Sequence, residues 1–389
     1  MTTDLESLTQ QTFDTVAETA TAQGMTAATA QLAEHFRAAE QYHELFDLRL
    51  LQARLDLGLP AILTKGLDDL EEPLRTKMED RYLDACREVG HLLLAAGRVR
   101  EAWMYLRPVG DRAAVAEALE KLPPQEDTVE QIVEVALYEG VHPRLGFELV
   151  IKNFGLCNAI TTYDAQMHQR PRAERQEVAA LLVRQIHADL LHTLTDYLTK
   201  KQGKTPQETT IAALVADRDW MFDDNEYHID TSHLAAVVRF ALVIDDAEAL
   251  RLAIDLTEYG RRLSAMFQYP GQEPFVDTYP THALFFRALV GEGVDEAVQY
   301  FRERAETADE QSSWPVEVYV GLLARLGRTE EAFEAAARQL ASARTTGFAP
   351  SLLDLAQRTG NYDRLLEISR QRGDLLGFTM GLAEQTRGK

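Results

Sequence analysis

The fold of this chain is decided by the stretch VYVGLLARLGRTEEAF, which runs from Val318 to Phe333. Apolar residues at helical spacing lead to Gly327, and a second helical segment then opens with Ala332 near its start. Glycine supplies the left-handed backbone that commonly ends a helix. A small residue such as Ala332 allows a neighbouring helix to approach closely. The stretch therefore predicts two helices joined by a glycine turn.

The same pattern recurs on both sides of this stretch. Gly293 precedes a segment with Ala297 at the small position, and Gly360 begins the next turn. Gly293, Gly327 and Gly360 are 34 and 33 residues apart. The C-terminal part, about 280–389, thus resembles the tetratricopeptide-repeat family, which repeats every 34 residues with such a turn. The resemblance implies stacked helical hairpins that bind a partner on their concave face.

The rest of the chain is expected to be helical as well. Apolar residues recur at helical spacing along most of its length, and alternating β-branched runs are missing. The predicted fold is all-α, an α-solenoid of stacked helical hairpins that is tetratricopeptide-repeat-like at its C-terminal end. An unrelated stack of αα-hairpins is the alternative. We expect N-terminal hairpins over 1–124, an atypical central helical segment over 125–233 and a helical-repeat segment over 234–389.

The charge balance limits the partners of the chain. Its 389 residues include 40 Lys plus Arg and 62 Asp plus Glu, a formal net charge of −22. A field of this sign repels phosphate backbones and anionic lipid surfaces. We therefore expect neither nucleic acid nor a membrane as a partner. The hydrophobic fraction of 46% is that of a folded globular chain.

The cysteines and the N-terminal residues indicate the compartment. Cys86 and Cys157 are the only cysteines and have no C-x-x-C spacing, so neither a disulfide framework nor a thiolate zinc site is expected. The opening residues, MTTDLE, show no basic stretch followed by an apolar core. No apolar run approaches the ~20 residues that cross a bilayer. We expect a cytoplasmic protein.

A metal site is one hypothesis for the central segment. The run WMFDDNEYHIDTSH, residues 220–233, gathers aromatic, acidic and imidazole side chains before a predicted helix. Three of these are metal-ligating types: His228, Asp230 and His233. Under this hypothesis one divalent metal ion activates water for hydrolysis, with Glu139 or Glu226 as general base.

The competing interpretation of the same segment is structural. An apolar stripe that starts at Leu234 predicts a helix, and a helix needs a capping residue just before it. Asp230, Thr231 or Ser232 supplies that cap, because each has a side-chain oxygen that accepts a backbone N–H. The histidines then pack or hydrogen-bond nearby.

A ligand-binding surface is the other hypothesis. Its candidate residues are His142, Arg144, Trp220, Tyr279 and His282. Pro143 can start a helix whose N-terminal amides, together with Arg144, suit a carboxylate or a phosphate. The loop 268–280 exceeds the repeat spacing and is rich in Pro, Gly and aromatic residues. Such inserted loops often form a binding face.

These patterns favour binding over catalysis. The phosphate-binding glycine loops, the G-x-S-x-G elbow and the H-E-x-x-H motif are absent from the sequence. The leading expectation is a helical-repeat interaction protein that binds a peptide, a protein or a small ligand on its concave face. The alternative is a metal-dependent enzyme, such as a hydrolase, with a His/Asp site in the central segment.

Overall fold

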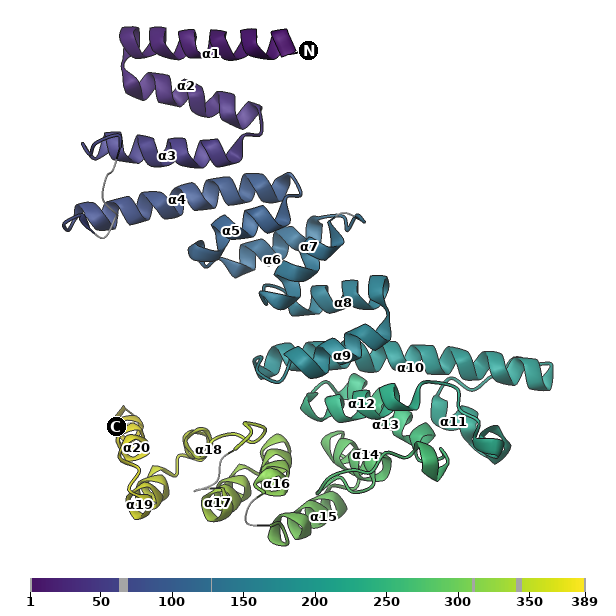
Figure 1. Cartoon of the computed structure of the whole chain (residues 1–389). Coiled ribbons are helices and arrows are strands. Elements are labelled where there is room, and N and C mark those ends of the chain that lie inside the picture. Colours follow the sequence, from purple (N-terminus) through teal and green to yellow (C-terminus); the bar gives the residue numbers. More distant parts are fainter. Residues whose placement is uncertain (1, 63–68, 127, 310–311, 341–344, 388–389) are drawn as a thin grey trace. The chain divides into compact units, whose positions relative to one another are not determined.

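The computed structural model describes residues 2–62, 69–126, 128–309, 312–340 and 345–387 (Figure 1). The chain is 75% helical, and no β-strand occurs within these ranges. A single isolated antiparallel bridge there joins Pro270 to Asp277. The expectation of an all-α protein is therefore confirmed.

The chain forms two compact units, Met1–Asn153 and Phe154–Lys389. Each has its own buried apolar side chains and is described by itself. The three-part division expected from the sequence, with limits at 124 and 233, separates segments by sequence character and stays a prediction.

In the first unit, the helices from α1 to α5 pack each against the next along the chain, and α5 also packs against α7 and η2. Its elements are α1 (Thr2–Gln23), α2 (Met25–Ala38), α3 (Tyr42–Asp56), α4 (Leu74–Ala95), α5 (Val99–Val109), α6 (Arg112–Lys121), α7 (Val129–Val133), the π-helix η2 (Glu134–Tyr138) and α8 (Pro143–Phe154). Helices α4 and α5 approach closely at Gly90, where an added Cβ would lie 2.4 Å from Leu106 Cγ. A side chain at position 90 would therefore separate the two helices.

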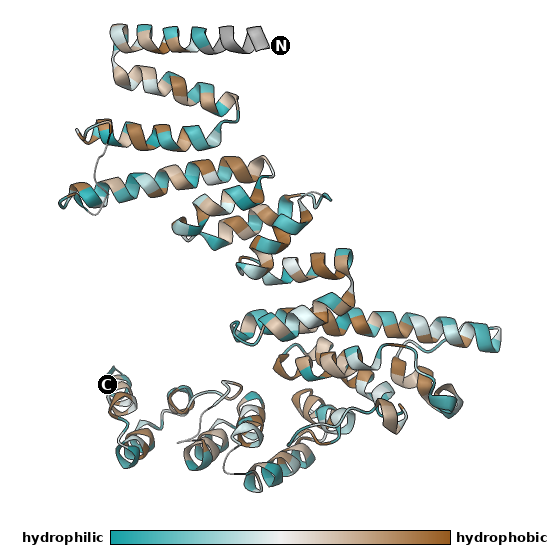
Figure 2. Cartoon of the chain, in the orientation of Figure 1, coloured by the Kyte–Doolittle hydropathy of each residue, from teal (hydrophilic) through white to brown (hydrophobic). Residues whose placement is uncertain are grey.

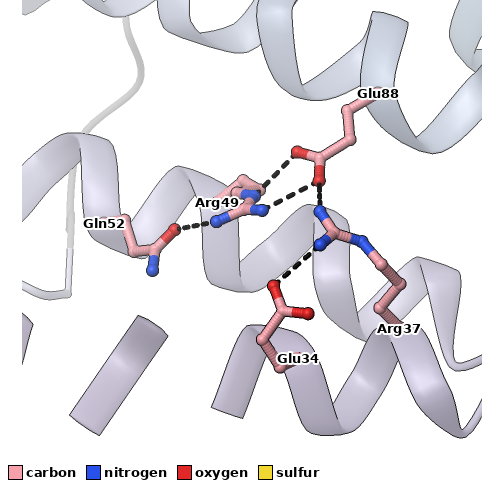
Figure 3. A network of polar contacts seen from close by, with 5 residues as sticks. All are labelled: Glu34, Arg37, Arg49, Gln52 and Glu88. Atoms are coloured by element: carbon pink, nitrogen blue, oxygen red, sulfur yellow. Dashed lines mark hydrogen bonds and ion pairs between the residues drawn. The ribbon is translucent and has the colours of Figure 1, made fainter. Parts of the chain in front are cut away.

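A polar network joins three of these helices (Figure 3). Glu88 of α4 accepts hydrogen bonds from Arg49 Nε at 2.7 Å and from Arg49 Nη2 at 2.8 Å, and it also pairs with Arg37. Arg37 in turn contacts Glu34, and Arg49 contacts Gln52. The hydrogen bonds from Arg49 are the main cause that lowers the pKa of Glu88. Glu88 thus ties α4 to α2 and α3.

Replacing Glu88 with glutamine is expected to lower the free energy of unfolding of the first unit by about 1–2 kcal/mol, because two guanidinium groups lose a charged acceptor that is only partly exposed. Urea titration at low salt measures the change. Glu44→Gln on α3 is the control, since Glu44 is exposed. Equal stability of the two variants contradicts the role given to Glu88.

In the second unit, consecutive helices pack against each other from α12 to α20, and α10 packs against α9, α11, α12 and α13. Its elements are α9 (Leu156–Gln166), α10 (Arg172–Gln202), α11 (Ile211–Val215), η3 (Asp219–Asn225), α12 (Thr231–Phe240), η4 (Ala241–Val243), α13 (Ala247–Gly260), η5 (Ala265–Phe267), α14 (Thr278–Leu289), α15 (Val294–Glu306), α16 (Trp314–Arg325), α17 (Thr329–Gln339), α18 (Leu352–Thr359), α19 (Tyr362–Arg372) and α20 (Leu375–Arg387). Alternate helices also touch, since α14 contacts both α12 and α16.

The glycine turns expected from the sequence are present. Gly293, Gly327 and Gly360 have φ values of 60°, 76° and 72°, in the left-handed region that favours glycine. They stand between α14 and α15, α16 and α17, and α18 and α19. The small residues Ala297 and Ala332 are fully buried. Three successive helical hairpins therefore share one turn chemistry.

One contact joins helices of this unit that are distant in the sequence. Arg325, at the end of α16, donates from Nη1 to the carbonyl of Leu242 at 2.7 Å and from Nη2 to the carbonyl of Ile244. Its Nε lies 2.8 Å from Asp245 Oδ1, an ion pair without the angle of a hydrogen bond. Burial lowers the pKa of Arg325 to about 10. The side chain thus joins α16 to the turn after α12.

Hydrophobic and hydrophilic residues are interleaved along the helices (Figure 2). No helix in the described ranges is long and apolar enough to cross a membrane.

Candidate ligand-binding cavity

A cavity of about 650 Å³ lies within the second unit. Its walls come from α9, the start of α10, α12, η4, the start of α14, the start of α16 and three connecting segments. The residues that matter for its chemistry are Tyr163, Arg175, Arg239, Phe240, Phe275, His282, Trp314 and Phe348. They are spread over 186 positions of the sequence, from 163 to 348.

The loop 268–277 forms one wall through its own hydrogen bonds. Gly271 N donates to the Val276 carbonyl at 3.2 Å, and Phe275 N donates to the Gln272 carbonyl at 2.7 Å. An added Cβ at Gly271 would lie 1.6 Å from the Phe275 carbonyl oxygen, so only glycine fits. This compact turn directs Phe275, 4% exposed, into the unit.

A buried carboxylate positions the opposite wall. Glu317 of α16 is fully buried, yet its oxygens accept hydrogen bonds from Thr346 N at 2.8 Å, Thr346 Oγ1 at 2.9 Å and Phe348 N at 3.3 Å. Ser313 Oγ adds a fourth donor at 3.1 Å. Because a buried carboxylate needs such partners, Glu317 fixes the segment that carries Phe348. That ring packs edge-on to Trp314 at 5.2 Å.

The floor of the cavity is aromatic. The rings of Phe275 and His282 stack with centroids 4.2 Å apart, and Tyr163 packs against Phe240 at the same distance. Phe275 also contacts Phe285, whose ring is fully buried. Aromatic surface of this kind favours an apolar or aromatic portion of a ligand.

Two arginines bring positive charge to the same cavity. Arg239 is exposed and Arg175 is partly buried. Neither guanidinium forms a hydrogen bond or an ion pair with any residue that the structure describes, and Arg175 Nε is buried without a partner. Elsewhere in the described chain most arginines have carboxylate partners. Unpaired guanidinium groups beside an aromatic floor suit a carboxylate ligand.

Of the predicted binding residues in this unit, the structure brings His282 into the cavity and leaves two outside it. Tyr279 is fully buried, with its ring against Gly260, and burial raises the pKa of its hydroxyl. Trp220 is 38% exposed and stacks on Tyr197 at 6.0 Å, away from the cavity residues.

The three predicted metal ligands form no ligand cluster among the described residues. Asp230 is the N-cap of α12, and its carboxylate accepts from Ser232 N at 2.9 Å and His233 N at 3.2 Å. The His228 backbone N–H donates to Tyr259 Oη at 2.7 Å, and burial lowers the pKa of its imidazole. Within the described ranges, no group of three His, Cys, Asp or Glu side chains is placed to hold a metal ion.

The remaining candidates make local pairs. Glu226 accepts a hydrogen bond from the Tyr197 hydroxyl. In the first unit, His142 Nε2 lies 2.7 Å from Glu120, Arg144 Nε lies 2.9 Å from Glu148, and Glu139 lies 3.8 Å from Arg107. Glu139 and Glu226, the proposed general bases, therefore lie beside no group of metal-ligating side chains among the described residues.

Sequence reasoning missed most of the cavity. Arg239 and Phe348 stand in no motif, because their proximity results from tertiary packing. Glu317 did leave a signal, since it is a lone carboxylate in the apolar run WPVEVYVGLL. A charged residue on the buried side of a helix indicates a polar partner nearby.

No protein-family model, curated protein or solved structure matches the chain.

Proposed function

We propose that the unit Phe154–Lys389 binds an organic anion with an apolar portion in this cavity, and that the chain is a helical-repeat binding protein. The observation that supports this proposal most directly is that Arg175 and Arg239, which have no described hydrogen-bond or ion-pair partner, lie beside an aromatic floor. The cavity volume of about 650 Å³ lies in the range of small-ligand sites, about 300–1,000 Å³.

We also propose that the helical hairpins of this unit are similar to tetratricopeptide repeats. The recurring positive-φ glycines and the buried alanines of α14 to α19 support hairpins similar to tetratricopeptide repeats. In such arrays alternate helices line one face, and the contacts of α14 with both α12 and α16 agree with this arrangement. The cavity opens among these alternate helices.

The charge of the whole chain bears on how an anion is selected. A net charge of −22 repels anions at long range. At close range, two guanidinium groups that pair with no described carboxylate supply directed hydrogen bonds to an anion, while Asp164 at the same cavity lies 3.7 Å from His168 Nε2. The site would therefore select a ligand by contact rather than by electrostatic attraction from a distance.

The test is titration of the full chain with 3-phenylpropanoate, which joins a carboxylate to an aromatic ring, followed by calorimetry. The double variant Arg175→Gln with Arg239→Gln is expected to raise Kd at least about tenfold, because each charge-assisted hydrogen bond contributes about 1.5–3 kcal/mol. Arg251→Gln, at an exposed position on α13 outside the cavity, is the control. An unchanged Kd in the double variant, or no binding by the unaltered chain, refutes the proposal.

A further inference from the structure

One nitrogen in the cavity wall has no partner. His282 is 2% exposed, and its Nε2 makes no hydrogen bond within the described residues. Its other ring nitrogen, Nδ1, lies 2.5 Å from the carbonyl oxygen of Thr278. A carbonyl oxygen only accepts, so Nδ1 carries the hydrogen.

This bond determines what Nε2 can do. Burial lowers the pKa of His282 to about 4, so the ring is neutral at pH 7. A neutral ring protonated at Nδ1 presents a lone pair at Nε2. Leaving such a buried acceptor unpaired costs about 1–3 kcal/mol. His282, which lines the cavity, therefore carries a buried acceptor that only a donor placed directly against its ring can satisfy.

The surrounding charge limits the kind of donor. Arg239 is near enough to lower the pKa of His282 further, and Arg175 lines the same cavity. Asp164 also lines this cavity, at 3.7 Å from His168 Nε2, but an ammonium group close to the two guanidinium groups would be repelled by them. A neutral N–H or O–H donor meets no such penalty. Stacking of the His282 ring on Phe275 places this acceptor beside the apolar floor.

We propose that the cavity recognises an N-acyl α-amino acid unit, either as a free small molecule or as the carboxyl-terminal residue of a peptide. Its carboxylate pairs with Arg175 and Arg239, its apolar side chain lies on the aromatic floor, and its amide N–H donates to His282 Nε2. This assignment rests on the proposed function and adds the donor to it.

The experiment uses three probes that differ in the donor: N-acetyl-phenylalanine, its N-methyl derivative and 3-phenylpropanoate. With the unaltered chain, N-acetyl-phenylalanine is expected to bind about tenfold tighter than the N-methyl derivative, which lacks the N–H. Calorimetry on the full chain gives each Kd.

Two variants of His282 separate the hydrogen bond from steric effects. His282→Asn retains an amide donor near the Nδ1 position but has no acceptor at the Nε2 position, whereas His282→Gln can present its carbonyl oxygen there. We expect the tenfold preference to vanish in His282→Asn and to persist in His282→Gln. Binding of 3-phenylpropanoate should change less than threefold in both.

The outcomes are distinct. If 3-phenylpropanoate binds and depends on the arginines, yet methylation has the same effect in the unaltered chain and in His282→Asn, the donor assignment is overturned while the proposed function stands. If none of the probes binds, both the proposed function and the donor assignment are overturned. A tetrapeptide ending in phenylalanine, compared with its carboxyl-terminal amide, separates the sources: tighter binding than N-acetyl-phenylalanine supports a peptide end, and weaker binding supports the free small molecule.

Discussion

Replacing Glu317 with alanine is expected to lower the free energy of unfolding of the second unit by about 3 kcal/mol. The side chain is fully buried and accepts hydrogen bonds from Ser313, Thr346 and Phe348. Its removal leaves backbone N–H groups without a partner and a cavity in their place, each of which costs on the order of 1–3 kcal/mol. The wall that carries Phe348 should detach before the rest of the unit unfolds.

Two measurements check this result. Urea titration gives the global change, and hydrogen–deuterium exchange of a peptide that covers 345–350 reports the local detachment. Glu330→Ala on α17 is the matched control, because Glu330 is exposed. Unchanged exchange at 345–350 in Glu317→Ala would show that the carboxylate does not hold this wall.

Acid should destabilise the second unit through His282. In the folded chain burial lowers its pKa to about 4 from an ordinary value of 6.5, so between these values the unfolded chain binds the additional proton. The stabilising contribution of the neutral ring is complete above pH 6.5 and is lost as the pH falls towards 4. At 1.36 kcal/mol per pH unit, the loss is about 2 kcal/mol by pH 5 and about 3 kcal/mol at pH 4.

A variant isolates this effect from other titrating groups. His282→Phe retains an aromatic ring against Phe275 and cannot titrate. The stability difference between the unaltered chain and this variant should shift by about 2 kcal/mol in favour of the variant between pH 7 and pH 5. His228, whose pKa burial also lowers, acts equally in both proteins. Parallel stability curves over this range would contradict the prediction.

The helical hairpins were predictable because their causes are local. Gly327 ends a helix through its own backbone preference, and Ala332 follows at a fixed offset on the next helix. Asp230 likewise caps α12 through bonds to residues two and three positions ahead. That cap was the structural alternative to metal ligation in the sequence.

The cavity was predictable only in part. His282 and the loop 268–280 stood out because of residue type and the irregular repeat spacing. Arg175 and Phe348 lie near them because of the way α10, α14 and α16 pack in the fold. The periodicity of the sequence does not predict such tertiary contacts. Tyr279, an aromatic residue at the start of a helix, is fully buried in the core, which its sequence position alone does not reveal.

The contact of Arg325 with the turn after α12 also bears on cooperativity. In arrays whose repeats touch only their neighbours, end repeats can melt separately. Arg325 closes a loop of 81 residues back to Ile244, so α16 cannot leave without exposing the carbonyls of Leu242 and Ile244. The segment from α12 to α16 should therefore unfold as one block, and under mechanical pulling it should yield in a single event while α18 to α20 peel away earlier.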